Sequence, residues 1–172
     1  MIALAPTPTL RTERLTLRAP QGEDWPAWKA FCTSDRAHFI RPDDSPRTAW
    51  RAFGHVIGHW AMRGFGSFVF YRHDDPTPIG MSGPWFPEGW PETEIGWTIW
   101  SPECEGQGYA AEAATAALAF ARDTLNWQSD VSYVHPDNHR SAALAARLGA
   151  TPDPEATAPG EDDLVYRHWG PA

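Results

Sequence analysis

Two hydrophobic periodicities alternate along the chain, one typical of strands and one typical of helices. In residues 12–18, Leu15 and Leu17 alternate with polar positions, which predicts a half-buried strand. After Ser45-Pro46, a capping hydroxyl followed by a proline suited to a first helical turn, apolar residues recur at intervals of three and four: Trp50, Phe53, Ile57 and Trp60. This spacing predicts an amphipathic helix that packs these four side chains against a core.

The same patterns predict further elements along the rest of the chain. A first helix begins at Glu23-Asp24-Trp25-Pro26 and would bury Trp28, Phe31 and Cys32. Further strands are predicted at 67–72, 79–84, 93–100, 131–134 and 164–167. Two more helices are predicted, one over 108–125 with an alanine-rich face and one that begins at Asp137 or Asn138 and ends at Gly149.

These elements predict a mixed α/β fold in a single domain over residues 1–172. The three strands between residues 67 and 100 are joined by short turns, which indicates an antiparallel meander. The helix over 108–125 then makes one strand–helix–strand crossover. A chain of this length can bury a core of its own.

Composition excludes several classes of protein. The net charge of −8 lacks the basic footprint of a general nucleic-acid binder, and no apolar run is long enough to span a membrane. Residues 1–10 contain no basic side chain, which argues against a signal peptide. The two cysteines, Cys32 and Cys104, are far apart, so we expect no disulfide framework and a cytoplasmic protein.

The charges are unevenly distributed. Residues 73–121 hold eight acidic side chains and no Lys or Arg, whereas residues 1–72 hold ten basic and six acidic ones. The middle segment would create a negative field suited to a cation, although a solvated acidic face explains the same pattern.

The segment with the clearest chemical meaning is Gly106-Gln107-Gly108, between a predicted strand and the alanine-rich helix. Glycines let backbone amides converge on one point, and a helix start adds unpaired N–H groups and the positive end of the helix dipole. Together they predict a site for a phosphate or diphosphate, or else only a tight turn with helix capping. No Lys or Arg is nearby in the sequence, so the backbone would do most of the binding. A nucleoside triphosphatase loop needs Gly-Lys-Ser/Thr, and a dinucleotide loop needs a third glycine where Ala111 stands.

A family resemblance extends over nearly the whole chain. The segments that carry it are Thr12-Glu13-Arg14-Leu15-Thr16-Leu17-Arg18, Ile79-Gly80, Glu94-Ile95-Gly96-Trp97, Glu105-Gly106-Gln107-Gly108-Tyr109-Ala110-Ala111-Glu112-Ala113, and Asn138-His139-Arg140-Ser141 followed by Leu148-Gly149. In this combination the chain resembles the GNAT N-acetyltransferases, within the branch of the ribosomal-protein N-terminal acetyltransferases (RimJ/RimL-like).

The resemblance implies the acyl-CoA N-acyltransferase fold, a strongly bent mixed sheet flanked by helices and splayed between its fourth and fifth strands. The pantetheine arm of acetyl-CoA would lie in that gap along Thr98, Ile99 and Trp100. The diphosphate would bind the residues Glu105, Gly106, Gln107, Gly108, Tyr109 and Ala110, and Asn138 and Ser141 would contact the arm near the sulfur. The implied reaction is acetyl transfer to a primary amine by direct attack in a ternary complex, without a metal. Dimers are common in this family, so a homodimer is one implied assembly.

Three positions depart from the family pattern. Glu103 stands where Arg or Gln is usual, and its carboxylate would repel a diphosphate. Ala145 stands where a Tyr commonly protonates the leaving thiolate. Ala150 replaces an aromatic residue, a change that concerns packing.

Acetyl transfer requires a neutral amine, so a base is expected near the acceptor. Alternation in the strand over 93–100 places Glu94 and Thr98 on one face and Ile95, Trp97 and Ile99 on the other. Glu94 is therefore the candidate base, directly or through water, unless it is an exposed strand-end carboxylate. Ser141 is the candidate hydrogen-bond partner of the thiolate, or else caps its helix.

Other reactive residues have simpler explanations. Glu112 is expected to cap or pair, Tyr109 to pack, and Cys104 lacks an activating base. Two histidine pairs, His55 with His59 and His135 with His139, have metal-ligand spacing but no third ligand, so hydrogen-bonded or exposed histidines are expected. The aromatic residues Trp85, Phe86 and Trp90 either pack or line an acidic pocket that would favour an ammonium group.

Two functions of different classes follow. The first is an N-acetyltransferase that acts on a protein N-terminus or a small cationic amine. The second is a non-catalytic acyl-CoA-binding module, which Glu103 and Ala145 would support. Release of the CoA thiol across a panel of amines discriminates between them.

Overall fold

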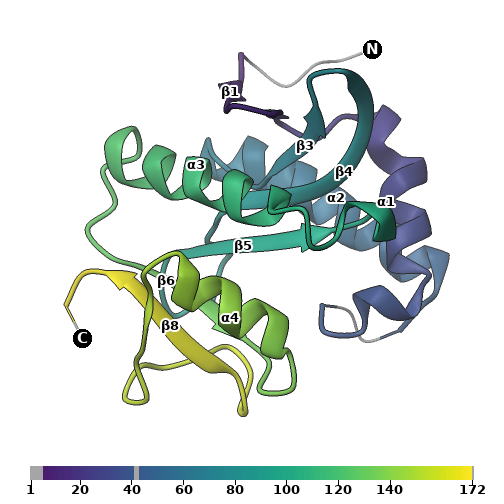
Figure 1. The fold of residues 1–172 in the computed structure, drawn as a ribbon. Coiled ribbons are helices and arrows are strands. Elements are labelled where there is room, and N and C mark those ends of the chain that lie inside the picture. Colours follow the sequence, from purple (N-terminus) through teal and green to yellow (C-terminus); the bar gives the residue numbers. More distant parts are fainter. Residues whose placement is uncertain (1–5, 41–42, 172) are drawn as a thin grey trace.

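The computed structural model describes residues 6–40 and 43–171, which form one eight-stranded sheet with helices on both faces (Figure 1). The strands are β1 (Leu10–Arg11), β2 (Leu15–Arg18), β3 (Phe68–Arg72), β4 (Asp75–Trp85), β5 (Glu94–Ile99), β6 (Asp130–Val134), β7 (Thr151–Pro152) and β8 (Leu164–Trp169). The helices are α1 (Trp25–Cys32), α2 (Pro46–Arg63), α3 (Tyr109–Asp123) and α4 (His139–Arg147), with short 3-10 turns η1 (Gly22–Asp24), η2 (Asp35–Ala37) and η3 (Pro102–Cys104). The sheet order is β1-β2-β3-β4-β5-β6-β8-β7. Neighbouring strands are antiparallel except β5 and β6, which are parallel.

The predicted order of elements and the mixed α/β fold are confirmed, with changes at three strands. Residues 12–18 are not one strand, because the chain turns where the Thr12 amide donates to the Leu15 carbonyl (3.0 Å) and β1 folds back on β2. The strand β4 begins at Asp75, inside a predicted turn, since Asp75 pairs with Arg72. The short strand β7 was not predicted. Within the described residues, no helix combines the length and the hydrophobicity that crossing a membrane would need.

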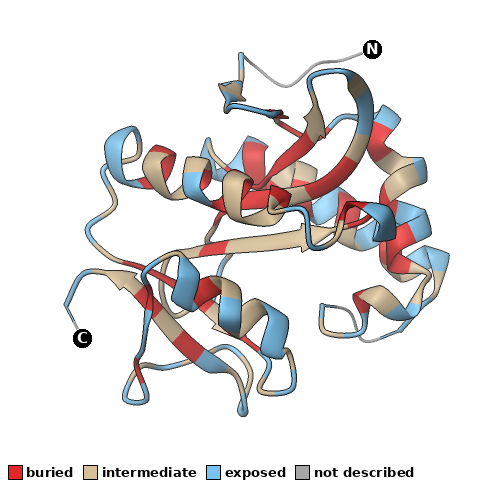
Figure 2. Ribbon diagram, viewed as in Figure 1, coloured by how far each residue is buried: buried red, intermediate tan, exposed pale blue. Residues whose placement is uncertain are grey.

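Apolar layers cover both faces of the sheet, and Figure 2 shows buried positions on the strands and on the inner sides of the helices. One layer lies under α3, where Phe68 and Phe70 of β3 join Ala113 and Phe120. Alanines let α3 approach the sheet closely, and Ala113, Ala114, Ala117 and Ala121 are fully buried. The other layer joins α1 and α2 to the opposite face through Trp28, Phe31, Phe53, Val69 and Trp100.

The helix α2 begins at Ser45-Pro46 as predicted and buries Phe53 and Trp60 as predicted, but its inward face excludes Trp50. The Ser45 hydroxyl accepts a hydrogen bond from the Thr48 amide (3.1 Å), and Gly64 ends the helix with φ at +77°. The inward face begins at Ala49, whose carbonyl accepts a hydrogen bond from the Trp28 indole (2.9 Å). Trp50 therefore points outward, where it is 61% exposed and touches the edge of Trp25. The assignment of Trp50 to the core was wrong.

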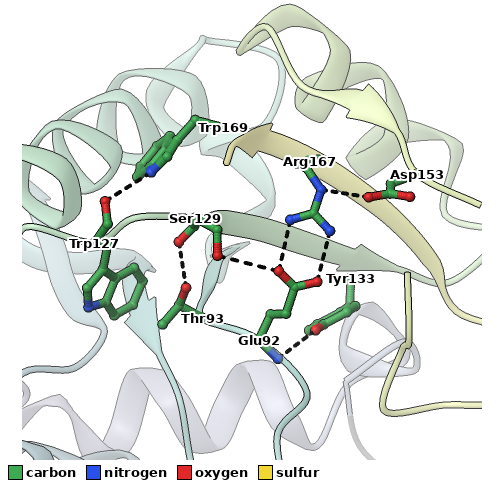
Figure 3. Close-up of polar contacts among 8 residues, drawn as sticks. All are labelled: Glu92, Thr93, Trp127, Ser129, Tyr133, Asp153, Arg167 and Trp169. Carbon is green, nitrogen blue, oxygen red and sulfur yellow. Dashed lines mark hydrogen bonds and ion pairs between the residues drawn. The ribbon is translucent and has the colours of Figure 1, made fainter. Parts of the chain in front are cut away.

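The seam between β5 and β6 positions the site. A single residue pair, Glu94 with Val131, joins the two strands. On that side the Thr93 hydroxyl donates to the Ser129 carbonyl (2.6 Å). Arg167 of β8 adds ion pairs with Glu92 (2.8 Å) and Asp153 (2.6 Å), as Figure 3 shows. We call this the closed end of the seam, and the end at Ile99 the open end; the expected splay is confirmed.

Candidate active site

A cavity of about 680 Å³ lies along the seam. The strand β5 contributes Glu94 through Thr98 to its wall, β6 contributes Ser132 through Val134, and α1 and α2 border it on one side. Asn138 and Ser141, at the start of α4, complete the wall. The candidate base and the candidate thiolate partner thus line the same cavity.

Glu94 lies at the closed end of the seam, with its carboxyl group held by the cavity wall. The Trp90 indole donates a hydrogen bond to its Oε2 (2.7 Å). Burial raises the pKa of Glu94 to about 7; the Trp90 indole and the Tyr133 backbone amide oppose this rise, and the charge of Asp163 adds to it. Glu94 is therefore not a freely solvated strand-end carboxylate. A carboxyl group of this pKa can both accept and release a proton near neutral pH.

The strand β5 gives the cavity two sides, because its side chains alternate. Glu94 is opposite Trp85 of β4, whose ring stacks on His59 of α2 (4.5 Å between centroids). Trp97 points the other way, packs against the alanines of α3, and its indole donates to the Ser141 hydroxyl (3.3 Å). Glu94 therefore faces α2, whereas Ser141 lies on the side of α3 and α4.

The hydroxyl group of Ser141 accepts the bond from Trp97 and so keeps its hydrogen for another acceptor. The backbone amide of Ser141 donates to Asn138 Oδ1 (3.2 Å), which caps α4. Ala145 is fully buried and offers no group to the cavity. Tyr133 of β6 lines the cavity and was missed in the sequence, where alternation within 131–134 was the available signal. Burial raises the pKa of Tyr133 to about 12, and its hydroxyl accepts from the Glu92 amide (3.2 Å).

The cavity is lined by aromatic and acidic groups, among them Phe39, Trp85, Trp90, Glu94 and Asp163. None of the described residues that line it is Lys or Arg. Phe86, expected beside Trp85 and Trp90, instead packs under the guanidinium group of Arg63 (5.2 Å). Such a lining favours an ammonium group through charge and cation–π contact.

His59 is a hydrogen-bonded core histidine, as expected. Its Nδ1 donates to the Phe65 carbonyl (2.9 Å) and its Nε2 accepts from the Phe86 amide (3.0 Å), so both ring nitrogens are used. Burial lowers its pKa, which keeps the ring neutral. His55, His135 and His139 are exposed. Among the described residues, no group of three His, Cys, Asp or Glu side chains is arranged to hold a metal ion.

The glycine loop has the backbone geometry that the anion-site prediction needs. Gly106 and Gly108 have φ of +70° and +81°, a region that L side chains rarely adopt. Gly108 caps α3, whose first amides have no acceptor within the helix. Arg14 holds the loop by donating to the Gln107 carbonyl (3.0 Å) and by forming an ion pair with Glu112 (2.6 Å). Glu112 was expected to cap or pair, and it pairs with an arginine 98 residues away.

Folding brings cations to this loop from distant parts of the sequence. Arg14 contacts the loop at Gln107 and Glu112. Two further guanidinium groups reach Glu105, that of Arg36 in η2 (2.8 Å) and that of Arg140 in α4 (2.6 Å). Folding likewise pairs Glu92 and Glu112 with arginines from other segments. Glu103 lies exposed on η3.

Only some of the main-chain groups from Thr98 to Trp100 face the seam, where the pantetheine arm was expected to lie. The Trp100 amide donates to the Ile79 carbonyl of β4 (2.8 Å) and so faces away from the seam. The Ile95 carbonyl accepts from Ser132 of β6 (2.6 Å), and the Ile99 carbonyl accepts from Arg36 (2.9 Å). Because main-chain groups alternate in direction, those of Trp97 and Ile99 are the ones that face the seam.

Comparison with known proteins adds the family. A family model described as "Acetyltransferase (GNAT) domain" matches residues 14–151. The crystal structure of an acetyltransferase from Agrobacterium tumefaciens str. C58 is 40% identical with a TM-score of 0.88, over 98% of both chains. The ribosomal-protein-S5-alanine acetyltransferase from Vibrio fischeri is 15% identical (TM-score 0.69; 92% of this chain, 94% of that one). A spermidine N-acetyltransferase from Vibrio cholerae, in complex with CoA and spermine, is 20% identical (TM-score 0.69; 91% and 94%). At these lower identities, the last two share the fold.

Proposed function

The chain belongs to the GNAT family of acetyltransferases, which use acetyl-CoA, and from this premise we propose that it acetylates a cationic primary amine with Glu94 as general base. The observation that carries the proposal is a carboxyl group with a pKa of about 7 in an aromatic cavity whose described lining holds no Lys or Arg. An ammonium group would be attracted to this cavity, and Glu94 could then remove its proton.

The reaction balances with the groups at hand. Glu94 takes a proton from the ammonium group, directly or through water, and the neutral amine attacks the thioester carbonyl in a ternary complex. The new C–N bond forms, the C–S bond breaks with its electron pair on the CoA sulfur, and the second proton of the attacking nitrogen passes to that thiolate, directly or through water. The Ser141 hydroxyl would donate a hydrogen bond to that thiolate, in place of the Tyr that Ala145 replaces. The main chain of Ile99 and the loop from Glu105 to Ala110, with Asn138 near the sulfur, would hold CoA.

The acceptor is proposed by its chemistry. The proteins with this fold include acetyltransferases for a ribosomal-protein alanine and for spermidine, and both acceptors are cationic amines in water. An acidic and aromatic cavity suits either a protein N-terminus or a small amine. A protein that bound acetyl-CoA but released no thiol with any amine would instead be an acyl-CoA-binding module.

Substitution of Glu94 tests the proposal. Glu94→Gln should lower kcat by about 10²- to 10⁴-fold, the usual contribution of a general base, with little change in CoA affinity. The base must be ionised to accept a proton, so kcat/KM of the wild type should rise as pH increases through about 7. The rise should occur at the same pH for amines of different pKa, and it should be absent in Glu94→Gln.

Two controls keep the outcome clear. Glu88→Gln alters a fully exposed carboxylate of the same loop and should leave kcat unchanged. A raised carboxyl pKa means that the ionised form opposes folding as pH increases, so Glu94→Gln should be no less stable than the wild type above pH 7. A folded Glu94→Gln variant with wild-type kcat at every pH would exclude Glu94 as the base.

A further inference from the structure

One carboxylate and two guanidinium groups meet at the open end of the seam. Glu105 contacts Arg36 through Oε1 (2.8 Å) and Arg140 through Oε2 (2.6 Å). Arg36 belongs to η2, beside α1, whereas Arg140 belongs to α4, which packs on β6 and β8. Glu105 therefore links the two sides of the seam, and the cluster has one positive charge in excess.

The guanidinium group of Arg36 has N–H donors that its present contacts do not use. Its Nη2 donates to the Ile99 carbonyl (2.9 Å), on the edge of β5 that faces the seam. Its Nε is buried, and among the described residues it has no hydrogen-bond partner. A guanidinium group offers five N–H donors in a planar fork that matches a phosphate, so this side chain is under-used by a single carboxylate and a single carbonyl.

The position of the cluster is the next argument. Glu105 immediately precedes Gly106, so an anion bound at the glycine loop would lie beside its carboxylate. Residues 73–121 contain no Lys or Arg, and the whole chain has a net charge of −8. A polyanion such as CoA would be repelled here unless cations came from elsewhere in the fold. Arg36 and Arg140 are such cations.

The pairing that now occupies them is exchangeable. The side chain of Arg140 is 81% exposed, that of Glu105 is 33% exposed, and that of Arg36 is 24% exposed. Ion pairs at such positions stabilise a protein by little, because water and salt screen them. A doubly charged phosphate can replace a singly charged carboxylate without a large loss of stability.

We propose that Arg36 and Arg140 bind a phosphate group of CoA, and that Glu105 occupies this guanidinium pair in the free protein until the cosubstrate displaces it. The proposal rests on the use of acetyl-CoA by this family and is independent of the acceptor and of Glu94. It makes the Glu105 carboxylate an internal competitor of the cosubstrate, whereas the Glu105 backbone stays part of the loop proposed to hold CoA. The two phosphate sources within CoA, the diphosphate and the 3′-phosphate, share this chemistry.

Calorimetric titration with CoA, without any amine, tests the proposal. Arg140→Gln should weaken CoA binding about tenfold, because hydrogen bonds between charged groups are lost. Glu105→Gln should tighten it by about threefold, because the competing charge is gone while the side-chain shape remains. Arg147→Gln is the matched control on the same helix and should bind as the wild type does. Arg140 and Arg147 are both exposed, so neither variant disturbs the core.

Truncated ligands identify the phosphate. Pantetheine lacks all phosphates, and we expect the wild type and Arg140→Gln to bind it equally. A defect that persists with 3′-dephospho-CoA assigns the pair to the diphosphate, and one that vanishes assigns it to the 3′-phosphate. The proposal is overturned if Arg140→Gln binds CoA like Arg147→Gln, or if Glu105→Gln binds it more weakly than the wild type. Neither result would bear on Glu94, because no acetyl group is transferred in these titrations.

Discussion

The two ends of the β5–β6 seam use the same chemical groups in inverted proportion. At the closed end one guanidinium group, Arg167, lies between the carboxylates of Glu92 and Asp153. At the open end one carboxylate, Glu105, lies between two guanidinium groups. Arg167 is 9% exposed and Arg140 is 81% exposed. The buried cluster at the closed end stays paired, because a buried charge without a partner is costly. In the more exposed cluster at the open end, an incoming anion can replace the carboxylate at small cost.

This difference explains how a splayed sheet can be both rigid and open. The closed end holds β5 against β6 and β8 and fixes the strand on which Glu94 stands, so the candidate base has a defined position. The open end leaves the main chain of Ile99 unpaired with β6 and places spare positive charge beside it. One half of the seam therefore determines geometry, and the other admits a ligand.

The largest expected effect comes from breaking the closed end. Arg167→Met leaves Glu92 and Asp153 without their cation and should lower the free energy of unfolding by about 3 kcal/mol at pH 7, measured by urea denaturation. The control Arg122→Met removes an exposed ion pair with Asp123 and should change the free energy of unfolding by less than about 0.5 kcal/mol. Equal losses in the two variants would contradict a structural role for the closed end.

The pH dependence sharpens this test. Hydrogen bonds from Arg167 lower the pKa of Glu92 and of Asp153 in the folded protein. Groups with lowered pKa stabilise the folded state above their unfolded pKa, and this contribution is lost as pH falls through the folded value. The wild type should therefore lose more stability between pH 5 and acid conditions than Arg167→Met does.

A change at the open end should affect binding more than stability. Acetyl-CoA should raise the melting temperature of the wild type, because it binds the folded state. Gly108→Val should cost about 1–2 kcal/mol, because φ is +81° there, and should abolish that rise. Gly54→Ala, in α2 with open space around it, should leave both quantities intact or gain up to about 1 kcal/mol. Normal acetyl-CoA binding by Gly108→Val would reduce the glycine loop to a simple turn.

The smallest effect is expected at Asp130, next to the closed end. Asp130 is fully buried, and in the described part of the chain its carboxyl oxygens have no hydrogen-bond partner. Burial raises its pKa well above the ordinary value, and the charges of Glu94 and Glu92 raise it further. A raised pKa destabilises the fold as pH increases, so the melting temperature of Asp130→Asn relative to the wild type should be higher at pH 9 than at pH 6. A variant that melts lower at both pH values would show that Asp130 needs its own carboxyl group.

The amino-acid sequence by itself determined the features that depend on near neighbours. Ser45 and Asn138 cap their helices as predicted, and alternation in β5 gave the side of the strand on which Glu94 lies. The glycine loop was recognisable because positive φ values and a helix start follow from local residue types. These rules involve a few adjacent residues, so no knowledge of the fold was needed.

Only the tertiary structure decided which distant charges meet and which groups lose water. Arg167 and Glu92 are 75 residues apart, and nothing near Glu105 in the sequence indicates that Arg36 would reach it. The outward turn of Trp50 depends on which face of α2 meets α1. The pKa of Glu94 depends on desolvation by residues from several elements. Pairing and burial are properties of the packed chain, because they arise from the path that brings separate segments together.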